Sequence, residues 1–154
     1  PDLYRRGMYT FWKRTVPPPN LATFDAPSRE TCTIDRPSTN TPLQALVLLN
    51  DVQFVEAARA FAERMVGVSG DDAVRLEWAF REALSRPPET EELEVLMGLL
   101  HRERQRYAAD PVAAQAFLSS GESPRNAEIP LAEHAAWGQV AAALLNLSET
   151  ITRN

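Results

Sequence analysis

Apolar residues recur at helical spacing through most of the chain beyond residue 41, and this pattern predicts an all-α fold. Between residues 52 and 66 the apolar positions fall three or four apart, with polar residues between them, as in an amphipathic helix. No segment alternates between apolar and polar residues for long enough to predict a strand. We expect an irregular bundle of five to seven helices, with helical segments over 42–49, 52–66, 72–85, from 90 onward, 111–118 and 131–147.

The place of a helix in the bundle follows from which of its faces are apolar. The segment 131–147 is apolar on nearly every side from Ala135 onward, so we expect it at the centre of the bundle. Gly138 within it would allow a neighbouring element to approach closely. The segment 52–66 has one apolar face, and its polar residues are expected to point to solvent: Gln53, Glu56, Arg59 and Glu63.

Residues that favour helix starts agree with these periods. Thr41 suits the N-cap, and Pro42 suits the first helical position, where its missing N–H costs nothing. Gln44 can reach back to the Thr41 backbone N–H, which would complete a capping box. Thr90 is expected to cap one later helix, and the pair Asp110-Pro111 marks the start of another.

Residues 1–41 differ from the rest of the chain and are expected to form a proline-rich arm and loop. Three consecutive prolines, at 17–19, stop any helix and favour an extended stretch. From residue 20 to residue 40 no hydrophobic period is sustained, which is unusual inside a compact domain. We therefore expect one domain over 1–154, with an arm and loop over 1–41 and a helical core over 42–154. The start at Pro1 rather than Met leads us to expect a fragment of a longer protein.

Composition places the chain among ordinary globular domains. It has 154 residues, 44% of them hydrophobic and 24% charged, and can bury a core of its own. A net charge of −5 argues against nucleic acid as the main partner. The single cysteine excludes an internal disulfide. No apolar run is long enough to predict a membrane-spanning segment.

Two N-terminal segments carry candidate ligand or interface residues. The aromatic and basic residues Trp12, Lys13 and Arg14 could stack on a sugar or nucleotide. We favour a different interpretation, in which Phe11 and Trp12 anchor the segment in the core. The loop 20–40 holds the richest polar set of the chain: Asp25, Arg29, Glu30, Asp35, Arg36 and Asn40.

The polar loop also has two interpretations. A structural clasp would pair Asp25 with Arg29 or Arg36, because charges removed from water must be paired. A carboxylate pair for acid–base chemistry is the alternative, but no catalytic spacing is met. We favour the clasp, and we expect Asp25, Arg29 and Asn40 to bond either to the helix start at Pro42 or to the aromatic segment.

The sequence offers no catalytic or metal-binding set. Cys32 is expected to be a buried or half-buried thiol. His101 lies in a charged helical run and should be solvated, whereas His134 is expected to have a hydrogen-bonded structural role. The two histidines lack metal-ligand spacing to each other or to Cys32, so we expect no metal. There is neither a glycine-rich phosphate loop nor a haem-attachment motif, so we expect no cofactor in this chain.

Several motifs, in order along nearly the whole chain, resemble one family. It is a planctomycete-specific domain of unknown function that closes large secreted proteins with planctomycete-type cytochrome c domains. Two departures from its pattern occur: the residues before Thr39 lack a frequent basic pair, and Val52 replaces a frequent proline. The motifs are Leu3-Tyr4-Arg5-Arg6, the run 9–19, Phe24-Asp25-Ala26-Pro27-Ser28-Arg29-Glu30 with Cys32, the run 39–46, Leu49-Asn50-Asp51, Gly121-Glu122-Ser123 and the run 145–151.

The resemblance implies an exported protein, in the periplasm or at the cell surface, with a haem-binding domain upstream of this chain. It implies no catalytic residues. Our first hypothesis is a non-catalytic helical module that packs on upstream domains of its own chain or on another exported protein. Our second is a carbohydrate-binding or carbohydrate-active domain that takes a polysaccharide at Trp12, Asp25, Arg29 and Glu30.

Overall fold

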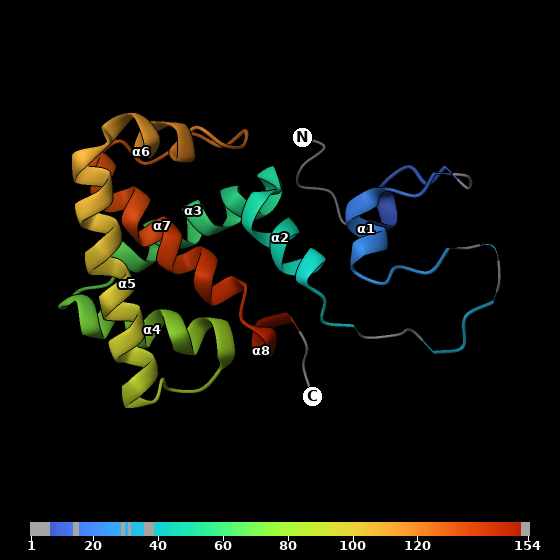
Figure 1. Cartoon of the computed structure of the whole chain (residues 1–154), viewed down its shortest axis with the longest axis horizontal. Helices are drawn as coiled ribbons and strands as arrows, with labels where there is room; N and C mark the ends of the chain where they lie inside the picture. Colours follow the sequence, from blue (N-terminus) through green and yellow to red (C-terminus); the bar gives the residue numbers. More distant parts are fainter. Residues whose placement is uncertain (1–6, 14–15, 29, 31, 36–38, 152–154) are drawn as a thin grey trace.

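The computed structural model is all-α, which confirms the fold class predicted from the sequence (Figure 1). The structure describes residues 7–13, 16–28, 30, 32–35 and 39–151. Within these residues there are eight α-helices and no strand, apart from an isolated bridge between Lys13 and Val16. The helices are α1 (Pro19–Thr23), α2 (Pro42–Asn50), α3 (Val52–Val66), α4 (Asp72–Leu84), α5 (Thr90–Ala109), α6 (Pro111–Leu118), α7 (Leu131–Leu145) and α8 (Ser148–Ile151).

The predicted helix starts are confirmed with one correction. The Thr41 side chain accepts from the Gln44 backbone N–H, and the Gln44 side chain accepts from the Thr41 N–H, so the capping box is complete. Asp110 caps α6 by accepting from the Ala113 N–H at 2.9 Å. The prediction for Thr90 was wrong: it is the first residue of α5 and Glu89 is the N-cap.

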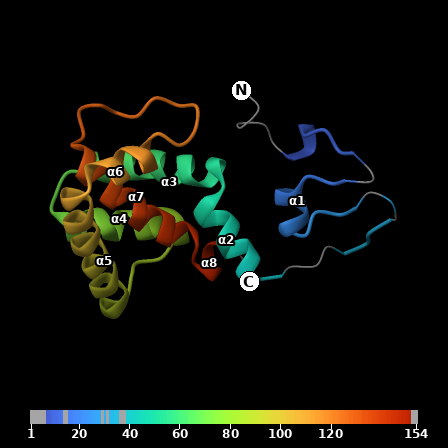
Figure 2. The same cartoon turned by 45° about the horizontal axis from the view of Figure 1, so that its top comes forward.

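The central position predicted for the last long helix is confirmed. Helix α7 packs against α3, α5 and α6, and runs through the middle of the bundle in both views (Figures 1 and 2). The side chains of Trp137, Val140 and Leu144 are completely buried. A Cβ added to Gly138 would lie 2.5 Å from the Phe117 ring, so this glycine does allow a close approach, by α6.

The N-terminal part contains a helix that the sequence pattern did not reveal. Helix α1 is only five residues long, too short for a hydrophobic period, but Pro19 at its first position favours it. Phe24, just after α1, contacts Phe54 of α3 with ring centroids 5.8 Å apart. A 3-10 turn, Gly7–Tyr9, precedes α1, and Figure 2 shows this whole part set to one side of the helical bundle.

Candidate functional site

The aromatic and basic N-terminal residues do not form a core anchor as a group. Phe11 is 83% exposed, which contradicts the expectation of a buried anchor, whereas Trp12 is half-buried. Lys13 is exposed, and Arg14 lies outside the described residues. The segment therefore offers aromatic surface to solvent, as an interface or stacking platform would.

In the polar loop, Asp25 bonds to the chain just before α2. Its Oδ2 accepts from the Thr39 backbone N–H at 2.8 Å and from the Thr39 hydroxyl at 2.7 Å. Asp25 has a φ of +58°, a conformation that aspartate tolerates better than most residues. These bonds reach Thr39, two residues before the N-cap at Thr41, so the expected bond of Asp25 to the helix start at Pro42 stays a prediction.

The remaining loop candidates are either exposed or outside the described residues. Glu30 and Asn40 are exposed, while Arg29 and Arg36 lie outside the described residues, so the clasp predicted for Asp25 is not tested. Cys32 is exposed, which corrects the expectation of a buried thiol. A carbohydrate-binding role for Trp12, Asp25 and Glu30 therefore stays a prediction.

Gln44 connects this loop to the bundle, and sequence reasoning had given it only a capping role. Its side chain is 1% exposed, and its Nε2 donates to the Thr23 carbonyl at 2.9 Å and to the Thr39 hydroxyl at 3.1 Å. A second link runs from Asn20 Nδ2 to Asp51 Oδ2 at 2.5 Å. Since both links end on α2 or its C-cap, the orientation of α2 is fixed at both ends.

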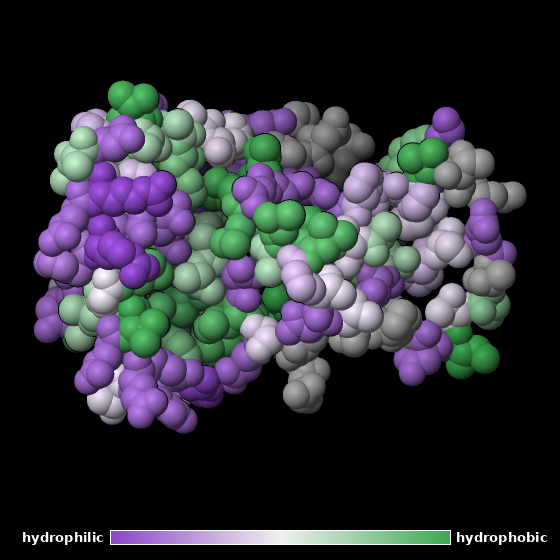
Figure 3. All heavy atoms as spheres, in the orientation of Figure 1, coloured by the Kyte–Doolittle hydropathy of each residue, from purple (hydrophilic) through white to green (hydrophobic). Residues whose placement is uncertain are grey.

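Helix α2 exposes an apolar face. Leu43, Leu46 and Leu49 are 56%, 57% and 46% exposed, and Val52 continues the row at 47%. There is no charged residue from Thr39 to Asn50. Figure 3 shows hydrophobic atoms gathered over α2 at the centre of this view. An uncharged leucine face held in a fixed orientation is typical of a contact surface.

A buried charged cluster lies between α3 and the loop 119–130. Glu56 and Arg59 are 4% and 2% exposed, so the prediction that they point to solvent was wrong. Glu56 accepts from the Glu122 and Ser123 backbone N–H groups at 3.0 and 2.8 Å. Arg59 donates to the Ser123 carbonyl at 2.7 Å and, more weakly, to the Leu118 carbonyl at 3.4 Å.

His134 lies beside this cluster and is completely buried. Its Nε2 is 3.3 Å from the Arg59 carbonyl and 3.6 Å from Glu63 Oε1, whereas Nδ1 has no partner among the described residues. Burial lowers the pKa of the imidazole; the Arg59 carbonyl and Glu63 oppose this shift, and the charges of Arg125 and Arg59 add to it. The expectation of a hydrogen-bonded structural histidine is confirmed, and His101 is exposed as expected.

A second cluster joins three helices. Arg104 of α5 donates to both carboxylate oxygens of Asp72 in α4 and to both of Glu133 in α7. Glu133 also accepts from the indole N–H of the buried Trp137 at 2.7 Å. The bond to Arg104 is the main reason why the pKa of Asp72 is lowered. This arrangement fixes the relative positions of α4, α5 and α7.

The structure thus contains two hydrogen-bonded polar clusters, around Arg59 and Arg104, and an exposed apolar face on α2. A family model for PSD1, a protein of unknown function (DUF1553), matches residues 1–100. The chain belongs to the PSD1 family. Neither the curated proteins nor the solved structures contain a match.

The PSD1 match covers α1 to α4 and ends within α5. It therefore includes Gln44 and the exposed face of α2, but not the loop 119–130 or α7. No group of three or more histidine, cysteine, aspartate or glutamate side chains in the described part of this PSD1 chain could hold a metal ion. Among the same residues, no helix is long and apolar enough to cross a membrane.

Proposed function

We propose that this PSD1 chain is a non-catalytic helical module that closes an exported multidomain protein and packs on its upstream domains or on another exported protein. The sequence motifs support this context, because they resemble a domain found after planctomycete-type cytochrome c domains in secreted proteins. Haem would then be bound upstream, and the whole protein would lie in the periplasm or at the cell surface.

The exposed face of α2 carries this proposal. Leu43, Leu46 and Leu49 each remain about half exposed although the chain has a packed core to bury them in. Burying apolar surface against a partner is favourable by roughly 25 cal/mol of free energy for each Å² removed from water, and exposed leucines do not gain this free energy. The face is also free of charge, which matches the depletion of charged residues at the centre of protein interfaces.

The way α2 is held favours an interface over a loosely attached helix. Its start is bonded through Gln44 and its C-cap Asp51 is bonded to Asn20, so the leucines keep one orientation. A surface that is already ordered loses less conformational entropy when it meets a partner. The same bonds tie α2 to the segment 19–25, so the two would dock together.

The direct test is co-expression of this chain with the upstream domains of its parent protein, followed by co-purification. Leu46→Lys places a charge at the centre of the α2 face and should weaken the association about tenfold or more. Val112→Lys is the matched control, since Val112 is 79% exposed on α6. A lack of association at high concentration, or equal effects of the two variants, would contradict the proposal.

A further inference from the structure

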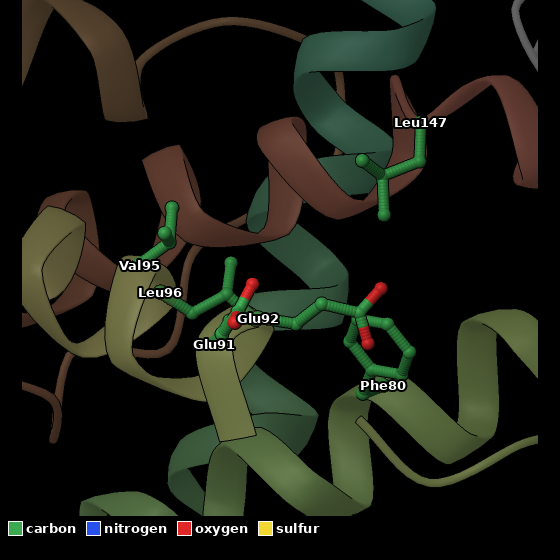
Figure 4. Close-up of a pocket in the computed structure, with 6 residues that line it drawn as sticks. All are labelled: Phe80, Glu91, Glu92, Val95, Leu96 and Leu147. Carbon is green, nitrogen blue, oxygen red and sulfur yellow. The ribbon is translucent and has the colours of Figure 1, made fainter. Parts of the chain in front are cut away.

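A second apolar surface lies at the other end of the bundle, as a hollow between α4, α5 and the residues after α7. Its volume is about 320 Å³, near the lower end of the range of about 300–1,000 Å³ for small-molecule pockets, so it suits one or two large side chains. Figure 4 shows its lining, which is Phe80, Glu91, Glu92, Val95, Leu96 and Leu147.

The entrance to this hollow is acidic. Glu91 is exposed and has no ion pair or hydrogen bond with another described residue. Glu92 binds Arg86, but that arginine is already shared with Glu149. The nearby charge is therefore negative, and a segment that combines an apolar side chain with a basic one would fit.

The chain itself contains such a segment, the residues 7–13, which we call the aromatic arm. Met8, Tyr9 and Phe11 are 67%, 66% and 83% exposed, and Lys13 follows them. Four basic residues and no acidic one occur from Leu3 to Phe24, whereas the rest of the chain has twelve basic and twenty-one acidic residues. The one charge of the arm, that of Lys13, is thus opposite to that of Glu91 at the hollow.

The arm and the hollow of one molecule lie apart. In both Figure 1 and Figure 2 the part around α1 is on one side, and α4 and α5 are on the far side of the bundle. A second copy is therefore the source that we consider for an arm in this hollow. In a two-fold exchange, each copy would supply one arm and one hollow, and the dimer would be closed.

We propose that the aromatic arm of one copy docks into the hollow of a second copy, with Phe11 inside and Lys13 against Glu91. This inference rests on the proposed function, since both treat exposed apolar segments as contact surfaces. It adds the surface that receives the aromatic arm, which is the hollow of a second copy. Each aromatic side chain buries roughly 150–250 Å². Two inserted Phe11 side chains therefore bury roughly 300–500 Å², well below the lower limit of about 1,200 Å² for specific interfaces, so the dimer is weak and depends on concentration.

Sedimentation equilibrium over a range of concentrations tests this on the full chain. Wild type should dimerise, and salt should weaken the dimer. Val95→Arg obstructs the hollow at a site that is 72% exposed, and Phe11→Ala removes the inserted side chain; each should weaken dimerisation about tenfold or more. Val112→Arg, on α6, is the matched control and should leave the dimer unchanged.

Mixing the two variants gives the sharper test. A Val95→Arg copy retains its arm and a Phe11→Ala copy retains its hollow, so the mixture should form a heterodimer through one intact contact. Neither variant alone can do this. The charge reversals Lys13→Glu and Glu91→Lys should each weaken the dimer, and the double variant should recover it.

Three outcomes would overturn the inference: a monomer at all concentrations, a dimer insensitive to Val95→Arg and Phe11→Ala, and a dimer lost only with Leu46→Lys. The last outcome would assign self-association to the α2 face. Co-purification with upstream domains is a separate measurement, so a monomer that still co-purifies would leave the proposed function intact. A dimer that is weakened by Val95→Arg and Phe11→Ala but does not co-purify with upstream domains would contradict the proposed function and support the exchange of arms.

Discussion

Glu56 and Gly121 are so close that no side chain can be added to the glycine. A Cβ at Gly121 would lie 2.1 Å from Glu56 Oε2, and the φ of Gly121 is +95°. The carboxylate occupies this space because it accepts from the two backbone N–H groups that follow, those of Glu122 and Ser123. The short motif Gly121-Glu122-Ser123 thus attaches the loop 119–130 to Glu56 of α3.

Gly121→Ala should lower the free energy of unfolding by at least about 2 kcal/mol, since both the clash and the positive φ oppose a side chain. Urea denaturation measures this as a lower midpoint. Gly98→Ala is the control: this exposed glycine lies in α5, with nothing within 4 Å of an added Cβ, and alanine should stabilise the helix by about 0.8–1 kcal/mol. Equal effects of the two substitutions would contradict the attachment.

Glu56→Gln keeps the shape of the side chain but leaves only one oxygen for two backbone N–H groups. The loss should be about 1.5–3 kcal/mol, the usual range for a hydrogen bond to a charged group. Differential scanning calorimetry should show a correspondingly lower melting temperature. The same change at the exposed Glu94 should stay within about 0.5 kcal/mol. A Glu56→Gln variant as stable as wild type would show that the loop does not depend on this carboxylate.

The bundle could be predicted from the sequence because its signals are local. The capping box of Thr41 and Gln44, the apolar period of α3 and the Asp110-Pro111 start of α6 act over only a few residues, and the observed bounds of α3 and α6 are those predicted. The all-round apolar character of α7 also predicted its central place. Each of these features is decided by propensity and pattern before any tertiary contact forms.

The buried polar residues could not be predicted because their partners are distant in sequence. Glu56 and Arg59 alternate with the apolar face of α3 as solvent-exposed residues do, and only the loop 119–130, more than sixty residues later, covers them. Hydrophobic periodicity cannot distinguish a charged residue exposed to solvent from a charged residue that a distant loop buries. The motif Gly121-Glu122-Ser123 was the available signal, but it gave no indication of its partner.

Gln44→Met should remove one of the two links between the N-terminal part and α2 while leaving the core packed. Methionine has a similar length but neither donates to the Thr23 carbonyl and Thr39 hydroxyl nor accepts from the Thr41 N–H. Hydrogen exchange should therefore become faster at the amides of Thr39 and Thr41, with no change in α7. The exposed Gln105 gives the matched control, Gln105→Met. Unchanged protection of both threonine amides would contradict the role given to Gln44.

Arg104→Lys should destabilise the bundle by about 1–2 kcal/mol, although it keeps the charge. A lysine cannot make paired bonds to the carboxylates of both Asp72 and Glu133, as the guanidinium of Arg104 does. Chemical denaturation gives the size of the loss. Arg102→Lys is the control on the same helix, because the Arg102 side chain is 71% exposed. A similar small effect at both positions would show that the three-helix contact contributes little.

The last prediction concerns pH and His134. Its folded-state pKa is lowered by burial, so the unfolded chain binds a proton at a higher pH than the native protein does. The free energy of unfolding should therefore be largest above the ordinary value near 6.5 and fall as the pH decreases toward the lowered pKa. Protonation is unfavourable because it places an N–H at Nδ1, for which no described residue offers an acceptor.

His134→Gln should remove this part of the pH dependence while keeping a donor for the Arg59 carbonyl, which Nε2 now approaches at 3.3 Å. Denaturation midpoints of wild type and variant between pH 5 and 8 should thus converge at the acidic end. The groups that face the imidazole, Glu63, Arg125 and Arg59, are unchanged in this comparison. Parallel profiles for wild type and His134→Gln would show that His134 does not titrate with folding.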